Sequence, residues 1–342
     1  MWKLVFIASV LFSAGIIGSD AELRPVCRKS EYLEGHWQRL QSLPPKTFNC
    51  NPQAESEGAV FTRRGTLNTT IPIHDGCECD KKLSSFAAQE RLMYEWTPKD
   101  CDLPKWDAAA FCAALDDRTI LFIGDSTMEQ SAVTVMSTIA STGGQCAPQL
   151  RYGRSNTFVY DIKNIDRKWF HYYEESGSPG ADIVVLAAGA WFEDTGDMYW
   201  ALDSVNQTIR SMRSKEGGKE PPKIIWKTQN PGHVQCQAFY HPITHMEEQM
   251  LNLTLDPRGW KFRWELFPVF DDMARSFAKQ EGWGVIDMSP LYLRPDAHIG
   301  RLGEFHKMGV APMEKLDCLH YCLPGPVDLF SVLLLHALVE GL

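Results

Sequence analysis

Short apolar runs alternate with helix-length stretches from residue 118 onward, and this alternation limits the possible folds more than any other feature of the chain. Strands that are covered on both faces are apolar or β-branched and are bounded by turn or charged residues. Four runs have this composition: 119–123, 182–187, 223–226 and 284–287. Helices are predicted at 128–140, 198–214 and 267–281, and an amphipathic helix is expected from about 326 to the C-terminus. The pattern predicts an α/β domain with a parallel sheet.

The size and charge of the chain narrow the class of protein. Its 342 residues, 44% of them apolar, are enough to bury a large core. The formal net charge is -9, and the Lys and Arg residues are scattered along the chain. The chain therefore lacks the basic patch that binds nucleic acid or an anionic membrane surface. We expect a neutral or weakly charged substrate and no nucleic-acid partner.

The N-terminus has the layout of a signal peptide. Lys3 precedes an apolar stretch at 4–17, which is followed by small residues and then by Asp20 and Glu22. This stretch is shorter than the roughly 20 apolar residues that a membrane-spanning helix needs, although an uncleaved signal anchor is an alternative that would tie the chain to a membrane. We predict a signal peptide at 1–19 and a mature chain on the lumenal or extracellular side.

All ten cysteines follow this leader, and their even number allows complete pairing in an oxidising compartment. Residues 20–112 are rich in cysteine and turn residues, and we expect an irregular, disulfide-tied segment there, before the α/β domain at 113–342. Asn68, Asn206 and Asn252 are each followed two residues later by Thr, which predicts N-glycosylation. These features together indicate the secretory pathway, either the Golgi lumen or secretion.

Metal binding is not expected, and no cofactor is predicted. A single residue separates Cys77 from Cys79, whereas about two to four residues usually separate paired zinc ligands. Pro242 lies between His241 and His245 and disfavours a helix that would present both imidazoles. Ordinary loop or core histidines are the better interpretation.

Ser126 is the candidate nucleophile. With Gly124 and Asp125 it ends the first predicted strand, directly before a predicted helix. A serine at such a turn has an accessible hydroxyl and lies near backbone N–H groups that can stabilise an oxyanion. Asp and Ser are also favoured at helix N-caps, so these residues could instead serve only to begin the helix.

Asp317 and His320 are the candidate partners of this serine. Their spacing lets the carboxylate reach one imidazole nitrogen, fix the tautomer and stabilise the imidazolium that forms when the ring takes a proton. A surface ion pair is the alternative. Cys318 and Cys322 could hold this loop covalently, which favours a catalytic role because a base must be held rigidly.

Two residues after strand ends are candidate oxyanion-hole donors. Gly189 follows the second predicted strand and could offer an unhindered backbone N–H, while Asn230 follows the third and could offer its side-chain amide. The alternatives are a plain turn glycine and an asparagine that is held extended before Pro231.

The order of these blocks resembles the SGNH or GDSL hydrolase superfamily. Residues 94–107 and 122–126, and the ending at 317–325, resemble more specifically the trichome-birefringence-like (PC-esterase) family of polysaccharide O-acetyltransferases. The resemblance implies a three-layer α/β/α, flavodoxin-like fold and a triad of Ser126, His320 and Asp317. It also implies that an acetyl group passes through an acyl-serine to a sugar hydroxyl of a polysaccharide or glycan, usually in the Golgi.

The chain departs from the family pattern at three places. It has Glu129 where Asn is common, Ala190 where His is common, and Lys227 where Arg is common. These departures leave the triad intact and leave the acceptor glycan open. A secreted esterase that transfers the acyl group to water is the first alternative, and a non-catalytic glycan-binding protein is the second.

Overall fold

The computed structural model describes residues 24–44, 89–159, 168–175, 180–214, 220–246, 263–299 and 317–341. The predicted leader at 1–19 and the sequons at Asn68 and Asn252 lie outside the described residues, as do Cys77 and Cys79. Among the helices within these ranges, none is long and apolar enough to cross a membrane.

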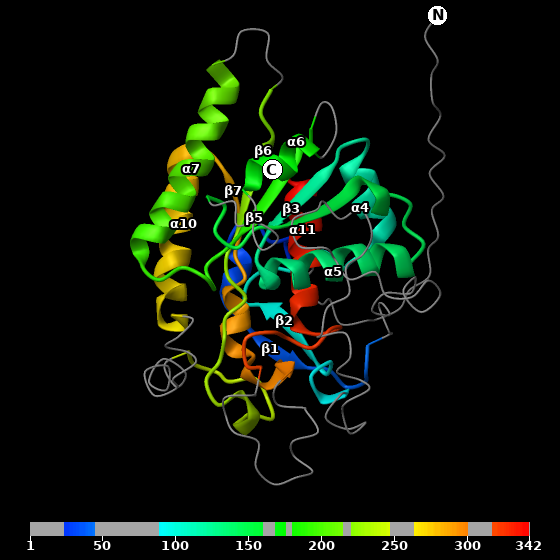
Figure 1. Cartoon of the computed structure of the whole chain (residues 1–342). Coiled ribbons are helices and arrows are strands. Elements are labelled where there is room, and N and C mark those ends of the chain that lie inside the picture. The colour runs from blue at the N-terminus through cyan, green and yellow to red at the C-terminus, as the bar shows by residue number, and fades with distance from the viewer. Residues whose placement is uncertain are drawn as a thin grey trace, which may run out of the picture.

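A five-stranded parallel sheet forms the centre of the molecule, with strand order β4-β3-β5-β6-β7 (Figure 1). In chain order this is the 2-1-3-4-5 arrangement of flavodoxin-like folds. The strands are β3 (Ile120–Gly124), β4 (Leu150–Arg154), β5 (Ile183–Ala187), β6 (Lys223–Lys227) and β7 (Gly284–Ile286). Four of them are the predicted strands. The edge strand β4 was not predicted, because two arginines and a glycine interrupt its apolar character.

Helices cover both faces of this sheet, as the three-layer prediction requires. Successive side chains of β3 enter opposite cores: Ile120 and Phe122 lie in one apolar cluster, and Leu121 and Ile123 lie in the other. Figure 1 shows α7 and α10 side by side on one side of the sheet and α5 and α11 on the other. The helices are α4 (Ala108–Leu115), α5 (Ser126–Ser141), α6 (Trp169–Glu175), α7 (Thr195–Ser214), α10 (Phe267–Glu281) and α11 (Leu329–Val339).

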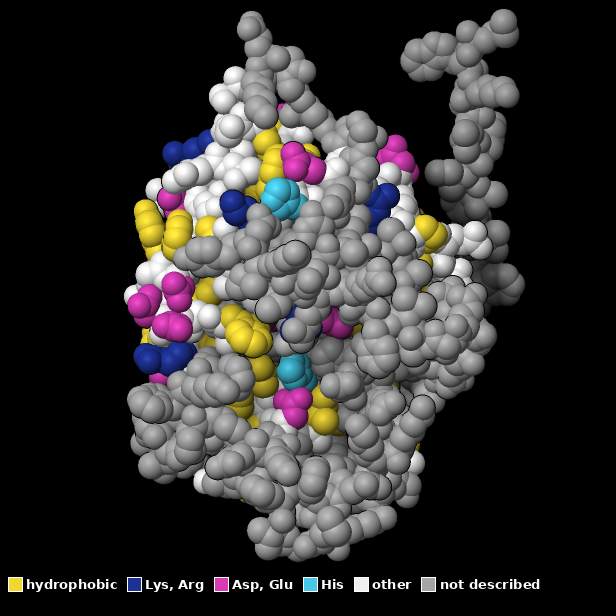
Figure 2. Space-filling model, viewed as in Figure 1, with side chains coloured by type: hydrophobic (Ala, Val, Ile, Leu, Met, Phe, Trp, Pro, Cys, Tyr) yellow, Lys and Arg dark blue, Asp and Glu magenta, His cyan; other side chains and the backbone are white. Residues whose placement is uncertain are grey.

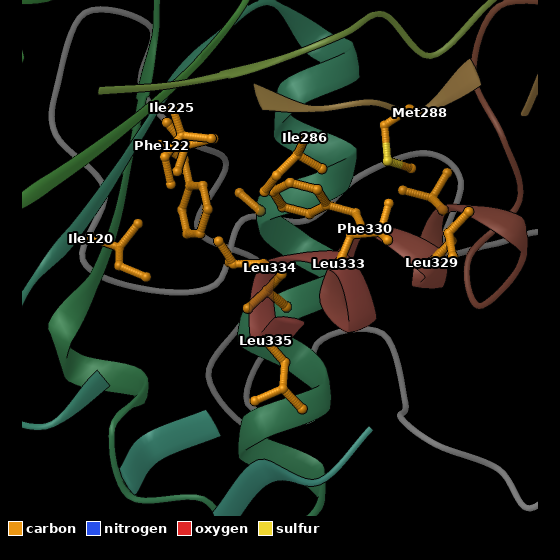
Figure 3. Close-up of a cluster of buried hydrophobic side chains, with 14 of the residues drawn as sticks. Ile120, Phe122, Ile225, Ile286, Met288, Leu329, Phe330, Leu333, Leu334 and Leu335 are labelled. Atoms are coloured by element: carbon orange, nitrogen blue, oxygen red, sulfur yellow. The ribbon is translucent and has the colours of Figure 1, made fainter. Parts of the chain in front are cut away.

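Helix α11 corrects the prediction of an amphipathic C-terminal helix. Its leucines and Phe330 pack on side chains of the sheet (Figure 3), and the rings of Phe330 and Phe122 lie 6.1 Å apart. Its polar residues Ser331 and His336 are buried too. The reason is that α4 and α5 also pack against α11, so that it is enclosed on several sides rather than on one.

The segment at 20–112 was expected to be irregular, but part of it is regular. Within it, β1 (Gly35–Arg39) and β2 (Tyr94–Pro98) form an antiparallel pair. This pair and the short helical turn Glu31–Leu33 that precedes it are docked on the α/β core. The hydroxyl of Tyr32 accepts a hydrogen bond from the backbone N–H of Asp287 at 2.9 Å, and the indole N–H of Trp37 donates to the carbonyl oxygen of Pro290 at 2.8 Å. The predicted boundary after residue 112 falls inside α4.

Three disulfides lie within the described part of the chain. They join Cys27 to Cys101, Cys112 to Cys146, and Cys236 to Cys318. Cys322 is also disulfide-bonded. These bonds confirm the prediction of a disulfide-containing fold.

The predicted glycosylation at Asn206 does not fit this fold. Asn206 lies within α7, and only 5% of the residue is exposed, on the face that packs against the sheet with Leu202 and Val205. A glycan on a buried side chain has no path to solvent.

The surface of the described part of the chain carries charges of both signs. In Figure 2, described acidic and basic side chains are interspersed on the visible face.

Candidate active site

The turn between β3 and α5 presents Ser126 at the first position of the helix. Gly124 is required there, because a Cβ atom at this position would overlap the carbonyl oxygen of Ala187 on the neighbouring strand. Asp125 is the N-cap residue. One of its carboxylate oxygens accepts the backbone N–H of Thr127 at 2.8 Å, and the other accepts the N–H of Ala190 at 3.3 Å. The serine turn is therefore tied to the loop that follows β5.

The structure brings Ser126, His320 and Asp317 into one hydrogen-bonded chain. The Oγ of Ser126 lies 2.7 Å from Nε2 of His320, and Nδ1 of His320 lies 2.8 Å from Oδ2 of Asp317. The other carboxylate oxygen of Asp317 accepts the backbone N–H groups of Leu319 and His320, at 3.1 and 2.9 Å. In this geometry Nδ1–H donates to the carboxylate and Nε2 faces the serine hydroxyl, as a general base must.

The two titratable partners shift each other's protonation. Burial alone would lower the pKa of His320, but the charge and hydrogen bond of Asp317 outweigh it and raise that pKa above its ordinary value. Burial opposes ionisation of Asp317 as well, but the contacts with His320 hold the pKa of this carboxyl well below its usual range. The carboxylate is thus charged at neutral pH and favours the imidazolium.

The loop that carries His320 is held from two sides. A disulfide joins Cys318 to Cys236, in the segment that follows β6. The side-chain amide of Gln130 donates to the carbonyl oxygen of Tyr321 at 2.6 Å and accepts its N–H at 3.1 Å. Both bonds are buried, so α5 and the histidine loop are joined directly. Sequence reasoning missed this contact, because the spacing of Gln130 from Ser126 gave no sign of it.

A buried pair of histidines lies behind the same loop. Nδ1 of His298 is 3.2 Å from the carbonyl oxygen of His320, and Nε2 of His298 is 2.6 Å from Nδ1 of His233. The second nitrogen of His233 lies 2.9 Å from the carbonyl oxygen of Tyr292. Burial lowers the pKa of both imidazoles, to about 4 for His233. Sequence reasoning missed this pair, because nothing in the spacing of two distant histidines indicates that they meet.

Glu129, noted above as a departure from the family pattern, forms an ion pair beside the site. Its carboxylate lies 3.1 Å from the guanidinium of Arg154, at the carboxyl end of β4, and 3.4 Å from the hydroxyl of Tyr152. Burial raises the pKa of Glu129, and the charge of Arg154 opposes this rise. Arg154 was invisible to sequence reasoning because β4 itself was not predicted.

Gly189 and Asn230 both lie beside the serine turn. Gly189 opens the turn after β5, where a Cβ atom would come within 2.8 Å of the side chain of Gln229. The amide nitrogen of Asn230 donates to the carbonyl oxygen of Thr127 at 3.2 Å, directly after Ser126 in the chain. Asn230 is completely buried. A role of either residue in binding an oxyanion stays a prediction.

No cluster of three metal-ligating side chains is found among the described residues. Nδ1 of His241 lies 3.0 Å from the hydroxyl of Tyr94 and 3.5 Å from the carboxylate of Glu90.

Comparison with known proteins gives a family and several curated relatives. Residues 145–337 match the model of PC-Esterase, the GDSL/SGNH-like acyl-esterase family found in Pmr5 and Cas1p. Xyloglucan O-acetyltransferase 1 of Arabidopsis thaliana is 26% identical, over 92% of this chain and 80% of the relative. Xyloglucan O-acetyltransferase 2 of the same plant is 22% identical, over 92% of this chain and 83% of the relative.

Among solved structures, a carbohydrate acetylesterase family member from Sinorhizobium meliloti matches with a TM-score of 0.38 and 12% identity, over 66% of this chain and 100% of that chain.

The segment at 145–337 that matches the PC-Esterase model begins after Ser126, contains Asp317 and His320, and covers more than half of the chain. The chain therefore belongs to the PC-Esterase family of GDSL/SGNH-like acyl-esterases.

Proposed function

We propose that this protein is a polysaccharide O-acetyltransferase in which Ser126, His320 and Asp317 form the catalytic triad. The observation that carries the proposal is the hydrogen-bonded chain from Ser126 through His320 to Asp317. It lies at the carboxyl edge of a parallel sheet, where open α/β folds bind their ligands. Serine, neutral imidazole and carboxylate in this order are the parts that acyl transfer through a covalent intermediate needs.

The proposed reaction has two halves. First, Ser126 Oγ attacks the acetyl carbonyl of an activated donor, its proton passes to Nε2 of His320, and the leaving group departs with that proton. Next, a sugar hydroxyl gives its proton to His320 and attacks the acetyl-serine carbonyl. The bond to Ser126 Oγ breaks as His320 returns that proton to Oγ, which releases the acetylated sugar and restores the serine hydroxyl. The carboxylate of Asp317 stabilises the imidazolium in both halves. An acyl donor is required, and no resident cofactor takes part.

Each half passes through a tetrahedral oxyanion, which needs N–H donors. We assign the backbone N–H groups of Ser126 and Gly189 to this role, because one opens α5 and the other opens the turn tied to Asp125 through Ala190. Asn230 contacts the same turn through Thr127. We retain Asn230 as a third proposed donor to the oxyanion.

Polysaccharide is the proposed acceptor because the named relatives are xyloglucan O-acetyltransferases that align over 92% of this chain. Hydrolysis of the acyl-serine is the competing outcome, since water and a sugar hydroxyl attack by the same route. We further propose that the protein works in the secretory pathway, in the Golgi lumen or after secretion. The disulfides support an oxidising compartment.

The experiment is an acceptor panel. Purified protein is incubated with 4-nitrophenyl acetate and, in separate reactions, with xyloglucan, xylan, mannan and pectin oligosaccharides. Free acetate and acetylated sugar are quantified in each. We expect acetylated oligosaccharide with at least one acceptor, and none with Ser126→Ala. Acetate release that depends on Ser126 with no acetylated sugar in any reaction would instead identify an esterase.

A further inference from the structure

A fully buried lysine lies beneath the proposed site. Lys227 ends β6, and none of its side chain reaches solvent. Its ammonium donates to the carbonyl oxygen of Thr228 at 3.0 Å and to Oδ1 of Asn230 at 2.8 Å. The ring of Phe330 lies 5.9 Å away. Among the described residues, no carboxylate forms an ion pair with it.

Such a residue is costly for stability. A buried ammonium loses its hydration, and two neutral oxygens compensate only in part. Burial accordingly lowers the pKa of Lys227 to about 7, although the charges of Asp125 and Asp271 favour its protonation. An apolar side chain of the same length would fill this position with less loss of free energy. The lysine is therefore better explained by what it does to its neighbour.

That neighbour is Asn230, whose amide has two possible orientations. An ammonium can only donate hydrogen bonds, so it selects the orientation that turns Oδ1 toward Lys227. The amide nitrogen then faces the opposite way, where it donates to the carbonyl oxygen of Thr127 at 3.2 Å. In the reverse orientation two oxygens would face each other at that contact.

We propose that Lys227 is a positioning residue of the acyl-transfer site: it orients Asn230 so that the amide nitrogen holds the turn that carries Ser126. The contacts run from β6 through Asn230 to Thr127, the residue that follows Ser126. The inference rests on the proposed function, because the turn matters for rate only if Ser126 is acylated. Without Lys227, the side-chain amide of Asn230 is free to reorient, and the turn that carries Ser126 then loses the hydrogen bond to Thr127.

The test compares the acylation rate with the stability of the same variants. The rate of labelling of Ser126 by a serine-directed fluorophosphonate is measured, together with kcat and KM for 4-nitrophenyl acetate. Lys227→Met should lower the labelling rate and kcat roughly ten- to hundred-fold, with little change in KM. Its melting temperature should stay equal to or above that of the wild type, because a buried charge is removed. A merely structural lysine would show the opposite: a lower melting temperature and an unchanged rate.

Two further variants sharpen the result. In the double variant Lys227→Met with Asn230→Ala, the loss of rate should not exceed that of the slower single variant, since both act through one contact. Lys223→Met is the matched control, because Lys223 begins the same strand and its ammonium donates to Gly341 at the surface. It should leave the rate unchanged.

The outcomes separate the two proposals. A wild-type protein that is not labelled contradicts the proposed function, and the inference falls with it. A labelled wild type with an equally fast Lys227→Met variant overturns the inference alone, as do losses that multiply in the double variant. Should Lys227→Met fail to fold, Asn230→Asp answers the question, because it keeps a partner for Lys227 but cannot donate to Thr127. A wild-type labelling rate in Asn230→Asp would contradict the proposal.

Discussion

Gln130 and Tyr321 join the helix that begins at Ser126 to the loop that carries His320. The side-chain amide of Gln130 donates to the backbone carbonyl of Tyr321 at 2.6 Å and accepts its N–H at 3.1 Å, and both bonds are buried. The distance between Ser126 and His320 therefore depends on the hydrogen bonds of Gln130 as well as on the sheet that positions the serine turn.

Replacing this glutamine should weaken both stability and catalysis. Gln130→Leu leaves the N–H and carbonyl of Tyr321 buried without partners, which costs about 1–3 kcal/mol for each unsatisfied group. We expect a lower free energy of unfolding in urea and a lower kcat for 4-nitrophenyl acetate. Gln207→Leu, at an exposed position of α7, is the control and should change neither. Wild-type kcat in Gln130→Leu would show that the contact does not align the site.

The pH dependence of acylation should report His320. The imidazole must be neutral to accept the proton of Ser126, and its pKa is raised above the ordinary value of about 6.5 by Asp317. The labelling rate should therefore rise with pH through a midpoint above about 6.5. Asp317→Asn removes the charge that raises this pKa, so the midpoint should move to lower pH while the maximal rate falls roughly 10³- to 10⁴-fold. An unmoved midpoint would mean that another group is titrating.

The disulfide next to the base should matter more for activity than the one on α4. Cys236→Ser and Cys318→Ser break the same bond and should each cost about 2–4 kcal/mol of stability and lower kcat, because the bond holds the His320 loop. Cys112→Ser breaks a bond remote from this loop and should reduce stability with kcat retained in the folded fraction. Equal losses of kcat in all three variants would contradict a local role.

Gly124 should not tolerate a side chain. In Gly124→Ala the new methyl group meets the carbonyl oxygen of Ala187 and the side chain of Met128, so we expect a loss of more than about 3 kcal/mol or no folded protein. Gly284→Ala is the comparison, because its nearest neighbour would lie at 3.4 Å, an ordinary contact. Urea unfolding of the two variants checks this, and equal stabilities would show that the close approach of β3 and β5 is not needed.

The sequence predicted those elements whose ends carry local signals. The range predicted for α10 agrees with the structure, since Pro268 lies in its first turn and Gly282 ends it in the left-handed conformation. The strand β4 carries Arg151, Gly153 and Arg154 and lacks such a signal. Helix α11 was expected to have a polar face, but burial by neighbouring helices is a tertiary effect that no local pattern records.

The same distinction applies to the site. Ser126 and His320, which lie 2.7 Å apart in the structure, were predicted as candidates because a nucleophile and a base need particular residue types in particular settings. Gln130 and His298 contact the His320 loop from segments that are distant in sequence, which spacing along a chain cannot reveal. Glutamine and histidine occur in the cores and loops of proteins of many functions, so their presence in a sequence does not indicate such a role.

The most direct test of the account is to map the covalent adduct formed with a serine-directed fluorophosphonate. The account predicts one adduct, on the peptide that contains Ser126, with a strongly reduced yield in His320→Ala and none in Ser126→Ala. An adduct that forms equally well in Ser126→Ala, or no adduct in the folded wild-type protein, would contradict it.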